Sequence, residues 1–188
     1  MLPAFCGALV GGFFTILGGW FSHRWQQQSL ERKERKTFRN VLKAFKQELA
    51  ILWKNYENII GSEIESIKKG EYLDRQYVMT QEYFTVYKNN VSIFSKLENE
   101  NLQESIINTY LSMCHLLDTI GFNNKILASY EKHYMEREGT GATKFVRSTD
   151  RLKNVLIQQV YLLKSHHKQA KNLINELLPQ LDRTIESL

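Results

Sequence analysis

Histidines are the side chains of this sequence best suited to acid–base or metal chemistry, and the clearest group is the pair in KSHHKQAK near the C-terminus. His166 and His167 are adjacent there, whereas two metal ligands on one helix face need a spacing of three or four residues. We therefore interpret the stretch as a solvated basic face of a helix, with a strip that contacts phosphates as the alternative. No arginine or carboxylate stands near His115, His166 or His167 at a spacing suited to acid–base work on RNA, so we expect none of them to be catalytic.

Motifs for nucleotide binding or covalent catalysis are missing from the sequence. It contains no GxxxxGK[ST], GxGxxG or GxSxG motif, and the stretch GTGAT lacks the preceding strand and the lysine–serine ending of a phosphate loop. The two cysteines, Cys6 and Cys114, form neither a metal-ligand spacing nor a disulfide framework. We expect a protein that is not an enzyme, with no catalytic residue, no cofactor and no metal. A helical ribonuclease is the enzymatic alternative.

Positive charge is concentrated directly after an apolar N-terminal run. Nine basic and three acidic residues lie between residues 23 and 54, so this segment accounts for the net charge of +5. Before it, residues 1–21 carry no charged side chain, and about 20 apolar residues in a helix cover the hydrocarbon core of a bilayer. We expect an uncleaved transmembrane helix over residues 1–23, because no basic segment precedes the run. An export signal and a buried core helix are the alternatives.

The residues that follow the run are typical of a membrane interface. Tryptophans stand where an aromatic belt would meet the headgroups, and the basic cluster obeys the positive-inside rule. We expect these residues at the interface: Trp20, Arg24, Trp25, Arg32, Lys33, Arg35, Lys36 and Arg39. The pattern predicts a single-pass protein of the bacterial inner membrane, with membrane lipids as partners and a cytoplasmic C-terminal domain.

Small residues form a stripe along the same run, at alternating intervals of four and three. The stripe consists of Ala4, Ala8, Gly11, Thr15, Gly18 and Ser22. Small residues let membrane helices approach closely, and further glycines beside the stripe make the small surface broad. The breadth favours a ring-shaped homo-oligomer over a two-fold dimer. The ordinary composition of membrane helices is the alternative interpretation.

Beyond the apolar run, the sequence predicts an all-α fold. Only two prolines occur, and apolar residues recur at intervals of three and four. A long juxtamembrane helix is expected over residues 24–60, with Phe38, Leu42, Phe45, Leu49, Leu52, Tyr56 and Ile59 on its apolar face.

Three further helices follow in this prediction. Apolar residues from Tyr77 to Leu97 indicate the second helix, and those from Leu102 the third, which continues to about Arg137. After the loop EGTGAT, a fourth helix is expected to end or kink at Pro179. Four long helices predict a four-helix-type bundle over residues 24–188.

The expected architecture resembles that of the small membrane accessory proteins encoded with type VI-B, RNA-guided, RNA-targeting CRISPR effectors. It consists of an N-terminal membrane helix, a basic juxtamembrane stretch and a helical bundle in 188 residues. The resemblance covers the whole chain and rests on architecture. It implies a bundle related to the helical nucleotide-binding HEPN domains, and a multimeric pore that strengthens defence against phage. HEPN nucleases carry an arginine four to six residues before a histidine, whereas Arg151 lies far from His166 here.

We therefore expect a membrane-anchored oligomeric effector whose pore perturbs the membrane in CRISPR-associated anti-phage defence. Its activator would be an RNA-guided effector or a nucleotide signal, and direct nucleic-acid binding is not expected. Two alternatives stay open: a membrane-tethered helical module that recruits a soluble partner, and a divergent HEPN-type ribonuclease. Conductance across a bilayer separates the first reading from the second, and RNA cleavage by the purified protein identifies the third.

Overall fold

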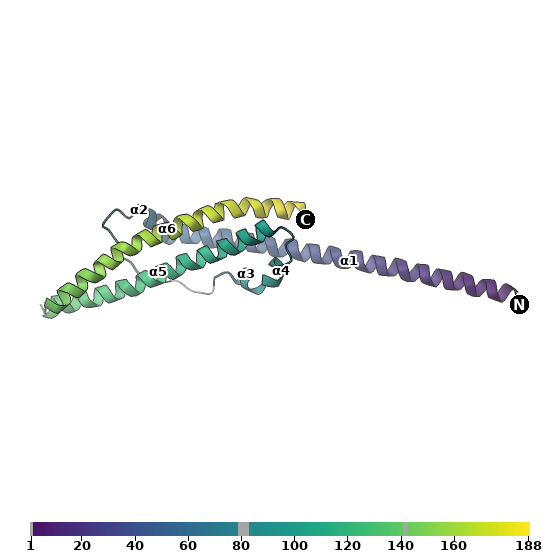
Figure 1. Cartoon of the computed structure of the whole chain (residues 1–188), viewed down its shortest axis with the longest axis horizontal. Helices are drawn as coiled ribbons and strands as arrows, with labels where there is room; N and C mark the ends of the chain where they lie inside the picture. The colour runs from purple at the N-terminus through teal and green to yellow at the C-terminus, as the bar shows by residue number, and fades with distance from the viewer. Residues whose placement is uncertain (1, 79–82, 141–142) are drawn as a thin grey trace.

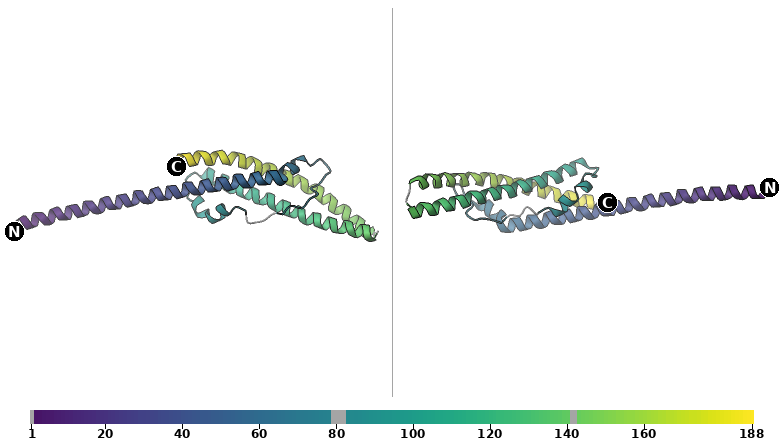
Figure 2. Two further views of the ribbon diagram at one scale, coloured as in Figure 1. Left: turned by 180° about the vertical axis from the view of Figure 1, so that it is seen from behind. Right: turned by 90° about the horizontal axis from the view of Figure 1, so that it is seen from below.

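Three long helices make up most of the molecule: α1 (Leu2–Tyr56), α5 (Glu100–Thr140) and α6 (Thr143–Ser187). A computed structural model describes the backbone except at residues 1, 79–82 and 141–142, and the side chains except at residues 1–17, 79–82 and 140–145. α5 and α6 run antiparallel as a helical hairpin, and the second half of α1 lies along them (Figures 1 and 2). The first half of α1 projects from this bundle as a free arm. The described residues form an all-α fold.

The part of α1 that joins the bundle buries one face. Leu42, Phe45 and Leu49 are almost fully buried at intervals of three and four residues, and Tyr56 continues the face two turns later. The next turn is a π-helix, η1 (Glu57–Gly61), which adds one residue to the turn. The expectation that Ile59 belongs to the core is therefore wrong: its side chain is 62% exposed.

Ile60 replaces Ile59 in the core, with no exposed surface. The shift by one residue follows from the π-turn. Successive residues of an α-helix are 100° apart around its axis, whereas a π-turn contains one more residue, so the side chain that faces the core comes one position later. The short helix α2 (Ser62–Ser66) then buries Ile64 on the shifted face.

The described residues of the stretch 77–97 do not form a second long helix, so the all-α bundle is confirmed but the expectation of four long helices is wrong. After α2 the chain runs through an irregular segment to two short helices, α3 (Thr85–Asn89) and α4 (Val91–Phe94). Leu73 and Phe84 anchor this stretch in the core. The side chain of Asn124 on α5 serves the backbone of Tyr77, because its amide Nδ2 donates to the carbonyl oxygen at 2.6 Å and its Oδ1 accepts from the amide N–H at 3.2 Å. At Tyr77, hydrogen bonds to a side chain of α5 thus take the place of the backbone hydrogen bonds of a helix.

The α5–α6 hairpin is also longer than expected. α5 continues to Thr140 and α6 begins at Thr143, so most of the stretch EGTGAT is helical. α6 also passes through Pro179 without ending. Proline removes the hydrogen bond to the carbonyl four residues earlier, here that of Asn175, and Asn175 and Pro179 are both exposed. Solvent can therefore satisfy that carbonyl.

The membrane assignment requires a correction. Within the part of the chain that the structure describes, no helix is both long enough and apolar enough to cross a bilayer. α1 has sufficient length with 55 residues, but its described side chains begin at Gly18 and become charged from Arg24 onward, whereas a crossing helix needs about 20 apolar residues. The expectations of a transmembrane helix over residues 1–23 and of a single-pass inner-membrane protein with a cytoplasmic C-terminal domain are therefore wrong.

The stripe of small residues falls largely outside the described side chains. Ala4, Ala8, Gly11 and Thr15 lie in the undescribed part, and Gly18 and Ser22 are exposed on the arm. A methyl group added at Gly18 would meet no other atom within 4 Å. A pore lined by this stripe would need a crossing helix, and the described residues contain none.

Candidate functional site

Side chains of α6 hold the α2 region against the bundle. Lys164, His167 and Lys171 are spaced by three and four residues, so they share one face of α6. Together with their partners Tyr56, Glu57 and Glu65, they form a group that we call the α6 clamp. The clamp joins the end of α1, the π-turn and α2 to the last helix.

His167 is the centre of the α6 clamp and is 97% buried, with a relative exposure of 3%. Its Nε2 lies 2.9 Å from Glu65 Oε1, and its Nδ1 lies 2.9 Å from the hydroxyl of Tyr56. Because a carboxylate only accepts, Nε2 carries the proton that it donates to Glu65, and Nδ1 shares a hydrogen bond with the Tyr56 hydroxyl. The Trp53 ring lies beside the imidazole, with 5.7 Å between centroids. Neither ring nitrogen is open to a substrate.

Glu65 connects the histidine to a lysine. Its Oε1 accepts from Lys171 Nζ at 2.7 Å, and the same ammonium lies 3.6 Å from Glu57 Oε1. The hydrogen bonds from Lys171 and then from His167 lower the pKa of Glu65, and the bond to Glu65 raises the pKa of Lys171. Burial, followed by the charges of Glu57 and Glu65, raises the pKa of Tyr56. The site therefore holds an ion pair and an un-ionised phenol, a combination that fixes structure and offers no activated nucleophile.

Lys164 closes the C-terminal end of α2. Its Nζ donates to the carbonyl oxygens of Glu65 at 3.2 Å and Ile67 at 2.5 Å. Carbonyls at a helix end have no partner within the helix, and a lysine ammonium is a favourable substitute. The hydrogen bonds from Lys164 on α6 therefore fix the path of the backbone as it leaves α2.

The interpretation of KSHHKQAK as a solvated basic face is wrong for three of its five basic positions. Lys168 is exposed, but His167 is buried and Lys164 and Lys171 are engaged. His166 faces the other way, because its Nδ1 lies 2.8 Å from the hydroxyl of Thr119 on α5. The spacing of three and four was readable in the sequence, but the complementary Glu65 lies about a hundred residues earlier.

His115 and His133 on α5 lie apart from the α6 clamp. His115 is exposed, with its ring centroid 6.3 Å from that of His166. His133 Nδ1 lies 2.8 Å from the carbonyl oxygen of Ser129, in the preceding turn of α5. Among the described residues, no cluster of three or more histidine, cysteine or acidic side chains is placed to hold a metal ion.

A hollow of about 390 Å³ lies directly beside the α6 clamp. The turn at residues 67–71 forms one wall and the α6 stretch 157–164 forms the other. Lys68, Lys69 and Lys164 border it, together with the ring of Tyr161. Clefts of this size accommodate small molecules.

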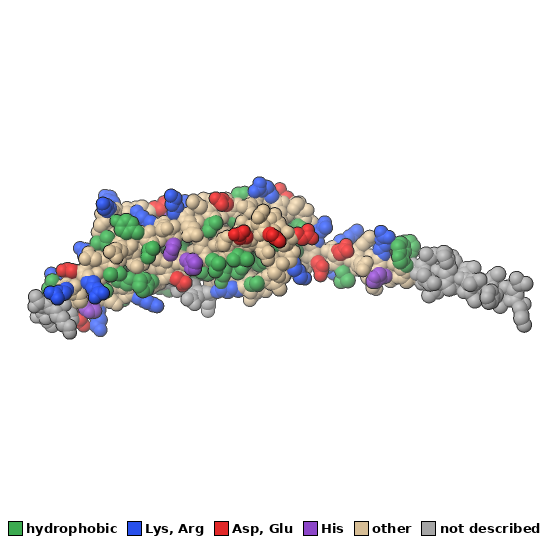
Figure 3. Space-filling model, viewed as in Figure 1, with side chains coloured by type: hydrophobic (Ala, Val, Ile, Leu, Met, Phe, Trp, Pro, Cys, Tyr) green, Lys and Arg blue, Asp and Glu red, His purple; other side chains and the backbone are tan. Residues whose placement is uncertain are grey.

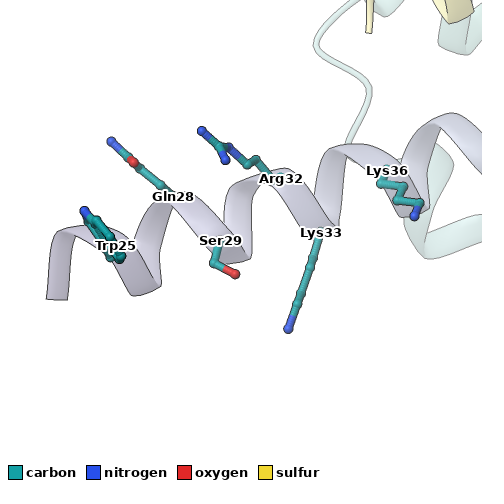
Figure 4. A pocket seen from close by; sticks show the side chains of 6 residues that line it. All are labelled: Trp25, Gln28, Ser29, Arg32, Lys33 and Lys36. Carbon is teal, nitrogen blue, oxygen red and sulfur yellow. The ribbon is translucent and has the colours of Figure 1, made fainter. Parts of the chain in front are cut away.

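The free arm of α1 carries the residues that the sequence assigned to an interface. Trp20, Trp25 and the basic positions up to Lys36 are all exposed, and Arg39 is half-buried where the arm meets the bundle. Basic side chains line this narrow part of the molecule (Figure 3). Trp25, Gln28 and Arg32 project to the same side (Figure 4), and the shallow hollow between their side chains is bordered by α1 alone. The arm is thus an open surface and not an enclosed pocket.

Comparison of the chain with protein-family models, with curated proteins and with solved structures gave no match. The resemblance to CRISPR accessory proteins therefore stays an expectation from sequence.

Proposed function

We propose that the chain is a non-enzymatic interaction protein whose bundle presents the α1 arm, residues 18–39, to the surface of a negatively charged lipid bilayer. The observation that carries the proposal is the arm itself: a helix that leaves the bundle with exposed aromatic side chains and, up to Lys36, exposed basic ones. Contact with headgroups needs no helix that crosses the bilayer.

Most of the aromatic and basic side chains of the arm lie on one face, and Lys33 lies on the other side (Figure 4). With 100° between successive residues, seven of these side chains fall within an arc of about 160° around the helix axis: Trp20, Arg24, Trp25, Arg32, Arg35, Lys36 and Arg39. Glu31 also lies inside this arc, near its Trp20 edge, whereas Lys33 and Glu34 lie outside it. A helix lying on a surface can therefore bring its aromatic and cationic groups to the same plane, where each lysine or arginine contributes about 1 kcal/mol against anionic lipid.

The order of side chains along the arm favours lipid over nucleic acid. Trp20, Phe21 and Trp25 gather at one end, and Arg24 lies over the Trp20 ring with 5.3 Å between its guanidinium carbon and the ring centroid. The other cations follow more than one turn later. Aromatic side chains of this kind are enriched at headgroup level, whereas single-stranded nucleic acid is held by aromatic and basic groups alternating along a groove.

Vesicle binding by the full chain tests the proposal. We expect the purified protein to co-sediment with phosphatidylcholine vesicles that contain phosphatidylglycerol, and the bound fraction to fall as salt rises. The triple variant Arg32→Gln, Arg35→Gln, Lys36→Gln should lose most of this binding. A control with equal charge loss on the bundle, Lys96→Gln, Lys132→Gln, Lys153→Gln, should retain it.

Two outcomes would overturn the proposal. Equal binding by the two triple variants would show that the arm is not the contact surface. Binding to single-stranded RNA in fluorescence anisotropy, lost in the arm variant while vesicle binding is unchanged, would assign the arm to nucleic acid. Both triple variants replace exposed side chains, so circular dichroism should show the same helix content as the wild type.

A further inference from the structure

We infer that the hollow between the turn at residues 67–71 and α6 binds a small phosphomonoester that carries a planar aromatic group, of the size of a mononucleotide. The site lies on the bundle and uses none of the arm residues, so it stands independently of the proposed lipid contact. Its volume of about 390 Å³ is within the range of small-molecule sites.

The base of the hollow is apolar. Ile67 and Val160 are buried with less than a tenth of their surface exposed, and Ile157 is half-buried beside them. Three of the lining residues lie on one face of α6, toward the turn at residues 67–71, because they are spaced by three and four residues: Ile157, Val160 and Tyr161. Tyr161 is 59% exposed, so a planar ligand group could lie against its ring and cover the apolar base.

The rim of the hollow is cationic. Lys68, Lys69 and Lys164 contribute three positive charges, and Glu71 contributes one negative charge. The Glu71 carboxylate is turned toward the backbone, because its Oε2 accepts from the Lys68 amide at 2.8 Å. The remaining excess of positive charge favours a dianionic group such as a phosphomonoester.

Lys164 is held in place by hydrogen bonds to the backbone at the end of α2. Two of the three ammonium hydrogens are used by the carbonyl oxygens of Glu65 and Ile67, which leaves one for a phosphate oxygen. A side chain already ordered in the free protein loses little conformational entropy when it binds.

The turn on the other side of the hollow is also fixed. Glu71 N–H donates to the Lys68 carbonyl at 3.1 Å, and Gly70 has a φ of +90°, a conformation that suits glycine. The two lysines of the turn are therefore presented by a defined backbone, opposite Tyr161. An apolar base, an exposed aromatic ring and three cations in one hollow match an aromatic phosphomonoester better than either phosphate alone or an uncharged ring.

Calorimetric titration of the full chain with AMP, with adenosine and with inorganic phosphate tests the inference; GMP and UMP report base preference. We expect saturable binding of at least one mononucleotide, with adenosine and phosphate each weaker by about tenfold or more, which corresponds to 1.4 kcal/mol. The variants Lys68→Gln with Lys69→Gln, and Tyr161→Ala, should each weaken binding by about tenfold. Lys153→Gln and Tyr134→Ala are matched controls on exposed parts of the hairpin and should bind as the wild type does.

Each remaining outcome would overturn the inference. Absence of saturable binding for all three mononucleotides would exclude the ligand class. Equal affinity for phosphate and AMP would exclude a role for the aromatic group. Unchanged binding in both site variants would place the ligand elsewhere. Lys68, Lys69 and Tyr161 are exposed, so their replacement leaves the fold intact, and thermal unfolding by circular dichroism verifies this.

Discussion

The hydroxyl of Tyr56 and Nδ1 of His167 are hydrogen-bonded at 2.9 Å, and this bond joins the last residue of α1 to the middle of α6. The π-turn begins at the next residue. A wider helical turn is less favourable than a regular one and persists where tertiary contacts hold it. The α6 clamp supplies those contacts at Tyr56, Glu57 and Glu65.

The Tyr56–His167 bond can be measured by substitution. His167→Phe keeps a ring in place but leaves the Tyr56 hydroxyl without its partner and removes one of the two hydrogen bonds to Glu65, so we expect a loss of about 1–3 kcal/mol in the free energy of unfolding. Urea denaturation of His167→Phe, Tyr56→Phe and the double variant should give a coupling energy of at least about 0.5 kcal/mol. His23→Phe, on the exposed arm, is the control. Additive losses would show that the bond contributes nothing.

The π-turn itself predicts a contrast between two neighbouring isoleucines. Ile60→Ala removes a fully buried side chain and should cost about 2–5 kcal/mol, whereas Ile59→Ala removes an exposed one and should change stability by about 0.5 kcal/mol or less. Chemical denaturation of the two variants measures the difference. A larger loss for Ile59→Ala would mean that a regular α-helix, and not a π-turn, leads into α2.

The case of these two isoleucines indicates how far the sequence could predict the fold. Local periodicity located α1, α5 and α6 and most of their buried faces, because burial of Leu42, Leu102 and Leu156 follows from spacing alone. It could not predict the π-turn, since nothing in the stretch ENIIG distinguishes Ile59 from Ile60 except the tertiary contacts of the clamp.

Long-range pairings account for the other differences. The segment expected as a second helix contains apolar residues at helical spacing, but Asn124 bonds to the backbone of Tyr77 and holds it in an irregular conformation. The role of His167 depends on Glu65, which no local pattern connects to it. The basic and aromatic residues of the arm are exposed up to Lys36, and their assignment to a membrane interface stays a prediction, whereas a crossing helix is not found among the described residues.

Glu65 makes the stability of the clamp dependent on pH. The hydrogen bonds from Lys171 and His167 lower its pKa in the folded protein, so the unfolded chain takes up the proton first as the pH falls. This contribution is complete above the ordinary glutamate pKa of about 4.3 and is lost as the pH falls through the lower folded-state value. We expect wild type to have a higher melting temperature than Glu65→Gln at neutral pH, and the gap to shrink below about pH 4.

Thermal unfolding at a series of pH values checks this expectation. Glu98→Gln, at an exposed position before α5, should show no such gap at any pH. A gap between wild type and Glu65→Gln that stayed constant into acid would mean that the carboxylate charge is not what holds the clamp.

Asn123 and Asn124 on α5 predict opposite effects of one substitution. Asn124 satisfies the backbone of Tyr77, and Asn124→Leu should lower the free energy of unfolding by about 1–3 kcal/mol. Asn123 has no exposed surface, and neither atom of its amide group has a hydrogen-bond partner among the described residues. A buried amide without a partner costs free energy that leucine, with a similar size, does not incur. Asn123→Leu should therefore raise the free energy of unfolding by about 1 kcal/mol or more. Urea denaturation of the two variants measures both values, and a loss of stability in Asn123→Leu similar to that in Asn124→Leu would show that the Asn123 amide is engaged in the folded protein.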